Sequence, residues 1–169
     1  WLVVRDLAPI ETASFWYESP EIASGELTPE SIETEVFLFP AAGHAEKSGT
    51  FTNTQRLLQF RDKALEPPSD ARSEAWFIHQ LALRLKKLAE ASDDPRDAPL
   101  RALDWWYPSD EHGEPDVSAV LAEINGFRTQ GEDGAHHGAQ LPGFGELADD
   151  GSTACGAWIY SGVLGPDGV

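Results

Sequence analysis

Three charged side chains lie where this chain could bind a ligand: Arg5, Asp6 and Lys47. Arg5 and Asp6 directly follow residues 1–4, an apolar run typical of a strand buried in a parallel sheet. Lys47 lies in a loop of small and polar residues that follows a second apolar run, 36–39. Since α/β folds bind ligands at the carboxyl ends of their strands, these positions indicate a candidate binding edge. An exposed ion pair and a surface lysine are the structural alternatives.

A fourth charged residue, Glu74, opens the clearest helical pattern in the chain. Ser73 precedes it as the predicted N-cap, and apolar residues then recur at helical spacing, at Ile78, Leu81, Leu85 and Leu88. A carboxylate in the first turn of a helix interacts favourably with the helix dipole. Compensation of the dipole therefore explains Glu74 without any ligand.

Other elements are predicted around these residues. Residues 51–60 mix apolar and polar side chains in a way that suits a hairpin or a strand that crosses to the surface. A helical turn is predicted over 12–17, and a short helix after Thr28, which precedes a proline and an acid. Asp116 is predicted to cap another short helix, which ends at Asn125 before a glycine.

Composition narrows the class of protein. The chain has 169 residues, enough for one domain with a hydrophobic core, and a net charge of -17, which argues against nucleic acid and anionic membrane surfaces. No apolar run approaches the roughly 18–20 residues that a membrane-spanning helix needs. The sequence contains no methionine and begins within a predicted strand. We therefore expect it to be a piece of a longer polypeptide.

The sequence predicts no catalytic residue and no metal ligand. His136 and His137 are adjacent, which makes them poor joint ligands, and no cysteine or carboxylate spacing frames them. Residues 149–153 have the composition of a turn and lack the alternating acids of a calcium loop.

The motif P-A-x-x-x-x-E-K-x-G-T-x-x-N-x-x-R, which starts at Pro40 and ends at Arg56, resembles a segment of the molybdopterin oxidoreductases. Within that superfamily, residues 52–77 and 149–163 resemble the major, catalytic subunit of respiratory formate dehydrogenases. These large subunits hold molybdenum or tungsten on two pterin–guanine dinucleotides. The resemblance covers nearly the whole chain and is weakest over 92–146.

The resemblance implies an α/β fold that is part of a Rossmann-like, mostly parallel sheet domain with flanking helices and long loops. Residues 1–91 are expected to form the C-terminal part of an α/β pterin–guanine-dinucleotide-binding domain. Residues 92–169 are expected to form a loop-rich extension with one short helix that packs on the larger subunit.

The resemblance also implies four cofactor-binding side chains. Arg5, Asp6 and Lys47 match positions that contact a guanine dinucleotide in nitrate reductase relatives. Asp6 can accept N–H bonds from the N1 and N2 edge of guanine, and Lys47 suits a phosphate or a guanine carbonyl. Glu74 matches an acid, usually aspartate, that binds the guanine end.

The implied activity is the oxidation of formate to CO₂, with release of two electrons and a proton. The implied cofactors are bis-molybdopterin guanine dinucleotide with molybdenum or tungsten, and a 4Fe–4S cluster that this segment does not bind. The implied partners are the rest of the catalytic subunit and an iron–sulfur electron-transfer subunit, with no nucleic acid and no direct membrane insertion. The segment alone is expected to be inactive, because the family's cysteine-rich motif and metal ligand lie elsewhere.

The sequence leaves alternatives open for both the location and the function of the parent protein. By resemblance the parent protein is exported, periplasmic and membrane-associated through its partners, with a cytoplasmic location as the alternative. A non-catalytic acidic interaction module, docking through the aromatic cluster at Trp105 and Trp106, is the competing function. A related enzyme such as nitrate reductase is another, although residues 149–163 favour formate dehydrogenase.

Overall fold

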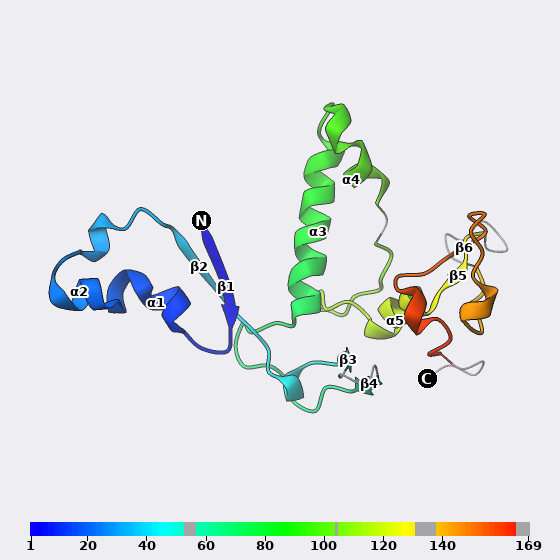
Figure 1. Ribbon diagram of the computed structural model, residues 1–169, viewed down its shortest axis with the longest axis horizontal. Coiled ribbons are helices and arrows are strands. Elements are labelled where there is room, and N and C mark those ends of the chain that lie inside the picture. The colour runs from blue at the N-terminus through cyan, green and yellow to red at the C-terminus, as the bar shows by residue number, and fades with distance from the viewer. Residues whose placement is uncertain (53–56, 104, 131–137, 165–169) are drawn as a thin grey trace. The chain divides into compact units, whose positions relative to one another are not determined.

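The computed structural model describes residues 1–52, 57–103, 105–130 and 138–164. The chain divides into two compact units, Trp1–Ala82 and Leu83–Val169. Both contain helices and short strands, so the expected mixed α/β class is confirmed (Figure 1). The expected boundary after residue 91 separates a part of a larger binding domain from a loop-rich extension. That division stays a prediction.

The first unit opens with a parallel strand pair. β1 (Leu2–Asp6) pairs with β2 (Val36–Pro40). α1 (Glu11–Glu18) and α2 (Pro20–Ser24) lie in the crossover between the two strands, as parallel pairing requires. Both predicted strands and the predicted helical turn over 12–17 are therefore confirmed.

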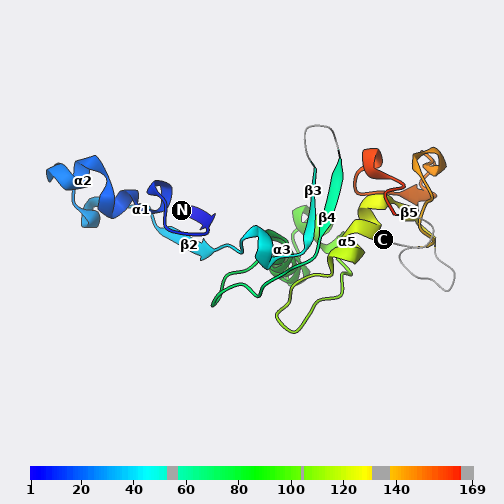
Figure 2. The same cartoon turned by 90° about the horizontal axis from the view of Figure 1, so that it is seen from below.

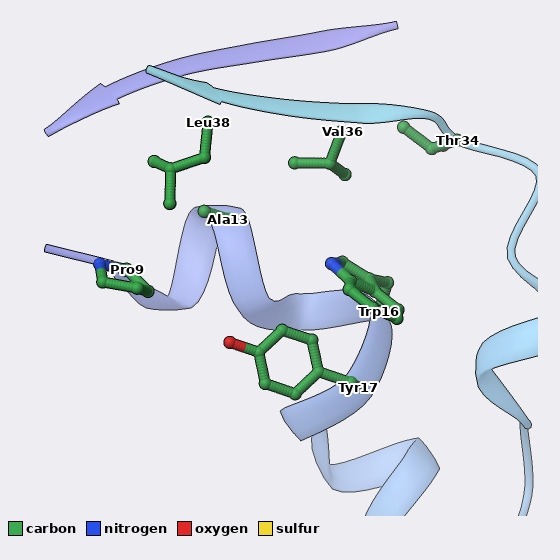
Figure 3. Close-up of a pocket in the computed structure, with 7 residues that line it drawn as sticks. All are labelled: Pro9, Ala13, Trp16, Tyr17, Thr34, Val36 and Leu38. Atoms are coloured by element: carbon green, nitrogen blue, oxygen red, sulfur yellow. The ribbon is translucent and has the colours of Figure 1, made fainter. Parts of the chain in front are cut away.

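The two faces of this strand pair are covered to different extents. Val36 and Leu38 point toward Ala13 and Trp16 of α1 and line an open pocket of about 340 Å³ (Figure 3). On the opposite face Phe37 pairs with Val3, and Val3 is 53% exposed. The sequence predicted a buried first strand, but the exposure of β1 is mixed, because Val4 is buried while Val3 is 53% exposed.

The first unit continues into a hairpin and a long helix. β3 (Gly49–Thr52) and β4 (Leu58–Arg61) pair antiparallel, which confirms the hairpin alternative for residues 51–60 (Figure 2). α3 (Glu74–Glu90) starts in this unit, and Ser73 caps it by accepting a 2.9 Å hydrogen bond from the Trp76 N–H. The predicted capped helix is therefore confirmed.

The apolar residues of α3 are not buried where the structure describes them. Ile78, Leu81, Leu85 and Leu88 are 61%, 44%, 43% and 70% exposed. Their helical spacing is typical of a face that packs against another element, yet each of the four remains at least 43% exposed. No helix among these residues is long and apolar enough to span a bilayer.

The second unit consists of short elements and loops. It contains α4 (Ala98–Ala102) and α5 (Val117–Asn125), followed by β5 (Phe127–Arg128), which pairs antiparallel with β6 (Thr153–Ala154). Asp116 caps α5 by accepting a 2.8 Å hydrogen bond from the Ser118 N–H, as the sequence predicted.

Asn125, the last residue of α5, holds the second unit together. Its side chain is fully buried, and the amide Nδ2 donates to the Leu141 carbonyl at 3.0 Å. The Oδ1 atom accepts from the N–H groups of Gly162 and Leu164 at 2.8 and 3.0 Å. One amide therefore joins three segments that are distant in sequence, and leaving its buried partners unpaired would be costly.

A Rossmann-like, mostly parallel sheet is not confirmed among the described residues, which form small parallel and antiparallel sheets. They form one parallel pair, β1–β2, and two antiparallel pairs, β3–β4 and β5–β6. The antiparallel pairs are a local hairpin and a two-residue ribbon, so each forms from chain segments without a helical crossover. The parallel component is confined to the first unit.

We expect Gly162→Ala to destabilise the second unit. Gly162 has φ of +89°, and an added Cβ would lie 2.8 Å from the Gly143 Cα. Left-handed backbone strain and this clash predict a loss of about 1–3 kcal/mol in the free energy of unfolding, measured by urea titration of the chain. Gly145→Ala is the control, because no atom lies within 4 Å of its added Cβ. Equal urea midpoints for the two variants would contradict this account.

Candidate functional site

The candidate site forms where the carboxyl ends of β1 and β2 meet the start of α3. The main chain of Arg72, two residues before α3, bridges to Ala41 in the parallel sense. Its N–H donates to the Pro40 carbonyl at 3.3 Å, and its carbonyl accepts from the Ala42 N–H at 2.8 Å. Arg72, the residue before the helix N-cap, thus adds one parallel bridge beside the end of β2. This bridge fixes the start of α3 against the strand ends.

Arg5 is held at this junction by two contacts. Its Nη2 donates to the Arg72 carbonyl at 2.7 Å, and its guanidinium lies 4.7 Å from the centre of the Phe77 ring. The Arg5 Nε is buried and has no hydrogen-bond partner within the described part of the chain. Arg5 also forms no ion pair within that part, so its positive charge lacks a direct counter-charge.

Asp6 follows at the end of β1. Its Oδ1 accepts a 2.7 Å hydrogen bond from the Leu7 N–H, and its carbonyl accepts from the Ala41 N–H at 3.1 Å. No described residue donates to its Oδ2. Asp6 and Arg5 form no salt bridge, so the predicted structural alternative of an Arg–Asp pair is not what the structure shows.

Lys47 and Glu74 form an ion pair. The Lys47 Nζ lies 2.5 Å from the Glu74 Oε2, and the two side chains are 14% and 60% exposed. Partial burial raises the pKa of Glu74, but the Lys47 hydrogen bond, a backbone N–H and the charges of Lys47 and Arg5 outweigh it. The net pKa of Glu74 lies below its ordinary value of 4.5.

The loop that carries Lys47 is held in place by contacts with the β3–β4 hairpin. The Gly43 N–H donates to the Glu46 side chain at 2.7 Å, which closes a single helical turn, His44–Glu46. Arg61, on β4, donates through its Nε to the His44 carbonyl at 2.9 Å and lies 5.4 Å from the Phe51 ring centre. The hairpin therefore fixes the loop from one side while Glu74 contacts Lys47.

The structure brings together three of the four predicted side chains. Glu74 pairs with Lys47, and the charge of Arg5 also lowers the pKa of Glu74, whereas the Asp6 carboxylate accepts from the main chain beside it. Sequence reasoning missed Phe77, Arg72 and Arg61, which hold these groups. Of these, only Phe77 could have been predicted from the sequence, because it lies three positions after Glu74 and residues three apart share a helix face.

Two motif positions and the paired histidines are not among the described residues. Asn53, Arg56, His136 and His137 lie outside the described residues. Within the described ranges, no group of three or more histidine, cysteine or acidic side chains could hold a metal ion.

Comparison with known proteins shows what this segment is similar to. The family model for molybdopterin oxidoreductase matches residues 37–84, which run from β2 through the hairpin into α3. This match covers the Lys47 loop and Glu74.

Individual relatives point to one branch of that superfamily. The chain is 34% identical over 166 residues to formate dehydrogenase subunit alpha of Megalodesulfovibrio gigas, covering 96% of this chain and 16% of that protein. It is 33% identical over 168 residues to the nitrate-inducible formate dehydrogenase major subunit of Escherichia coli, with the same coverage. For formate dehydrogenase 2 subunit alpha of Nitratidesulfovibrio vulgaris the identity is 35% over 166 residues, and the coverage is 96% and 15%.

These matches confirm the resemblance to formate dehydrogenase major subunits within the molybdopterin oxidoreductase superfamily. The chain spans only 16% of the length of the first two relatives. It is therefore similar to one segment of such subunits.

The donors present fit a dinucleotide cofactor. Arg5 offers a buried Nε without a described partner, and Lys47 has three N–H donors of which Glu74 takes one. The open Oδ2 of Asp6 is an acceptor of the kind that a guanine N–H edge needs. Two cations and a carboxylate at one edge match a molecule that carries both phosphates and a guanine.

We expect Lys47→Gln to raise the pKa of Glu74 toward 4.5, since the substitution removes the charge-assisted hydrogen bond. The lowered pKa means that the pair stabilises the fold above pH 4.5, and that this contribution is lost as pH falls through the folded-state pKa. Because Glu74 is 60% exposed, solvent screening limits the contribution to about 1 kcal/mol or less. Carboxyl NMR titration measures the pKa, with Lys87→Gln as the control. An unchanged Glu74 titration in Lys47→Gln would refute the ion pair.

Proposed function

We propose that this chain works as a segment of a molybdenum- or tungsten-dependent formate dehydrogenase catalytic subunit, where it binds one molybdopterin guanine dinucleotide. The observation that carries the proposal is the cluster of Arg5, Lys47 and Glu74 at the carboxyl edge of β1–β2, of which Lys47 and Glu74 lie inside the segment that the family model matches. The proposed reaction of the whole subunit is the oxidation of formate to CO₂ with release of two electrons and a proton.

Each side chain has a proposed role toward the dinucleotide. Arg5 and Lys47 neutralise phosphate charge or donate to the guanine carbonyl, because both are cations with N–H groups left to give. Asp6 accepts from the N–H edge of guanine, and Glu74 binds the guanine end of the dinucleotide. The bound cofactor supplies the redox chemistry, and this segment supplies position and electrostatics. The metal ligand, the 4Fe–4S cluster and the catalytic residues belong to other parts of the proposed subunit, so this segment alone is inactive.

We further propose that β1 and β2 belong to a larger Rossmann-like sheet. The parallel bridge between Arg72 and Ala41 adds a third parallel segment beside β1 and β2, as expected for part of a parallel sheet. Val3 and Phe37, on the face opposite α1, are 53% and 39% exposed, and a doubly wound sheet covers both faces with helices. The missing strands and helices come from the rest of the subunit.

The proposed partners follow from length and exposed surface. The relatives are about six times longer than this chain, so the rest of the same subunit is the first partner. The apolar side chains of α3 supply a surface for it to cover. An iron–sulfur electron-transfer subunit is the second proposed partner, and an exported, periplasmic location remains a proposal with the cytoplasm as its alternative. Neither the interaction-module nor the nitrate reductase reading has an observation in its favour.

We expect Asp6→Ala and Lys47→Ala to weaken retention of the cofactor in the full-length subunit. A hydrogen bond to a charged group contributes about 1.5–3 kcal/mol, so each loss predicts about a tenfold or larger fall in affinity. The measurement is GMP released by acid hydrolysis, together with metal content, in each purified variant. Asp70→Ala is the matched control, because Asp70 is exposed and lies outside the cluster. Normal GMP and metal contents in both Asp6→Ala and Lys47→Ala would contradict the proposal.

A further inference from the structure

An open apolar pocket lies between α1 and β2 in the first unit (Figure 3). It has a volume of about 340 Å³, and the side chains of Val36 and Leu38 point across it toward α1. Its lining residues are Pro9, Ala13, Trp16, Tyr17, Thr34, Val36 and Leu38. None of them is charged, so the pocket suits an apolar group.

Two aromatic side chains of α1 form one wall of the pocket. Trp16 and Tyr17 are 39% and 40% exposed, and their ring centres lie 4.6 Å apart in an edge-to-face arrangement. Leu38, on β2, is also 40% exposed. Tryptophan and tyrosine are enriched among the residues that dominate binding at protein interfaces, where they surround a buried anchor. The pocket therefore has the composition of a site that receives a large side chain from another polypeptide segment.

The segment that builds the pocket is strongly acidic. Residues 7–35, which include α1 and α2, contain no lysine or arginine. They contain seven glutamates, all of them exposed: Glu11, Glu18, Glu21, Glu26, Glu30, Glu33 and Glu35. At physiological ionic strength a charge acts over about 8 Å, which is close to the width of a helix, so the glutamates of α1 act on a group that binds beside it. The pocket therefore favours cations at its edges and repels anions.

The charge and the openness of the pocket narrow the choice of occupant. The chain has a net charge of -17, so a second copy would be repelled. The proposed dinucleotide and formate are anions and are disfavoured for the same reason. Sites for small molecules enclose most of the surface of the ligand, whereas this pocket is open to solvent. A polypeptide segment with one apolar anchor and neighbouring lysine or arginine residues fits best.

We propose that this pocket binds an apolar side chain from another part of the same catalytic subunit, on a helix that lies beside α1 and carries lysine or arginine next to its apolar anchor. This inference rests on the proposed function, which makes the chain a segment of a longer subunit. The chain spans 16% of the length of the first two relatives, so most of such a subunit lies outside it. Parallel sheets are covered by helices on both faces, and α1 has only 8 residues, which leaves room for a second helix.

Photo-cross-linking in the full-length subunit tests the inference. The photo-reactive residue p-benzoylphenylalanine replaces Tyr17 in one variant and Trp16 in another, because both positions line the pocket and both are already aromatic. The matched control carries the same residue in place of Phe37, which is 39% exposed on the opposite face of β2. After irradiation, gel electrophoresis gives the mass of the product, and mass spectrometry of its peptides identifies the captured residue.

We expect the two pocket variants to capture the same peptide, and the product to have the mass of a single subunit. The captured peptide should lie outside these 169 residues and should carry lysine or arginine within one helical turn of the captured side chain. The Phe37 control should capture a different peptide, because it faces the other side of the sheet.

The role of the acidic segment is tested by neutralising Glu11→Gln and Glu18→Gln together in the Tyr17 variant. At the urea concentration that halves capture in that variant, we expect the yield of the cross-link to fall by about twofold, as loss of exposed ion pairs predicts. Glu90→Gln with Glu111→Gln is the control pair, because both residues are exposed and lie in the second unit. An equal yield in the test pair and the control pair would reject a cationic partner.

Three further results would overturn the inference. A product with the summed mass of two polypeptides would make the occupant a partner subunit or a second copy. A captured peptide without lysine or arginine would contradict the proposed chemistry. Capture from neither pocket position, in variants that unfold at the normal temperature, would show that nothing fills the pocket. The GMP content of the same preparations tests the proposed function separately, because a subunit without GMP rejects that function whatever the pocket captures.

Discussion

The candidate site depends on one main-chain carbonyl, that of Arg72. It accepts from the Ala42 N–H at 2.8 Å and from the Arg5 Nη2 at 2.7 Å, so it joins the end of β2, the end of β1 and the start of α3. A carbonyl has two acceptor sites, and both are used here. With the strand ends fixed against the helix, the side chains of β1, the Lys47 loop and the first turn of α3 necessarily converge.

The two faces of the strand pair are covered unevenly. α1 lies along the face of Val36 and Leu38, while Val3 and Phe37 on the other face stay substantially exposed. α3 contacts the sheet through Phe77 and Phe39 at its first turn, and its later apolar residues are exposed. A chain that is similar to 16% of a much longer subunit is expected to present surfaces of this kind.

Local sequence patterns predicted the helices and strands. They did not predict contacts between residues that are far apart in the sequence. Ser73 and Asp116 cap helices because their short polar side chains accept from N–H groups two or three residues ahead, a property visible in sequence. The resemblance located Arg5, Lys47 and Glu74 in one site. It did not show that Lys47 and Glu74 pair, or that Asn125 joins three segments, since those contacts cross 27 and up to 39 residues. Spacing within a helix or strand cannot specify such partners.

The most direct test of the central claim is a structure of the full-length subunit with its cofactor bound. The account predicts that one guanine dinucleotide lies at the carboxyl edge of β1–β2, with a guanine N–H about 3 Å from the Asp6 carboxylate and the Lys47 ammonium on a phosphate or the guanine carbonyl. A structure in which both dinucleotides are bound entirely by residues outside this segment would contradict it.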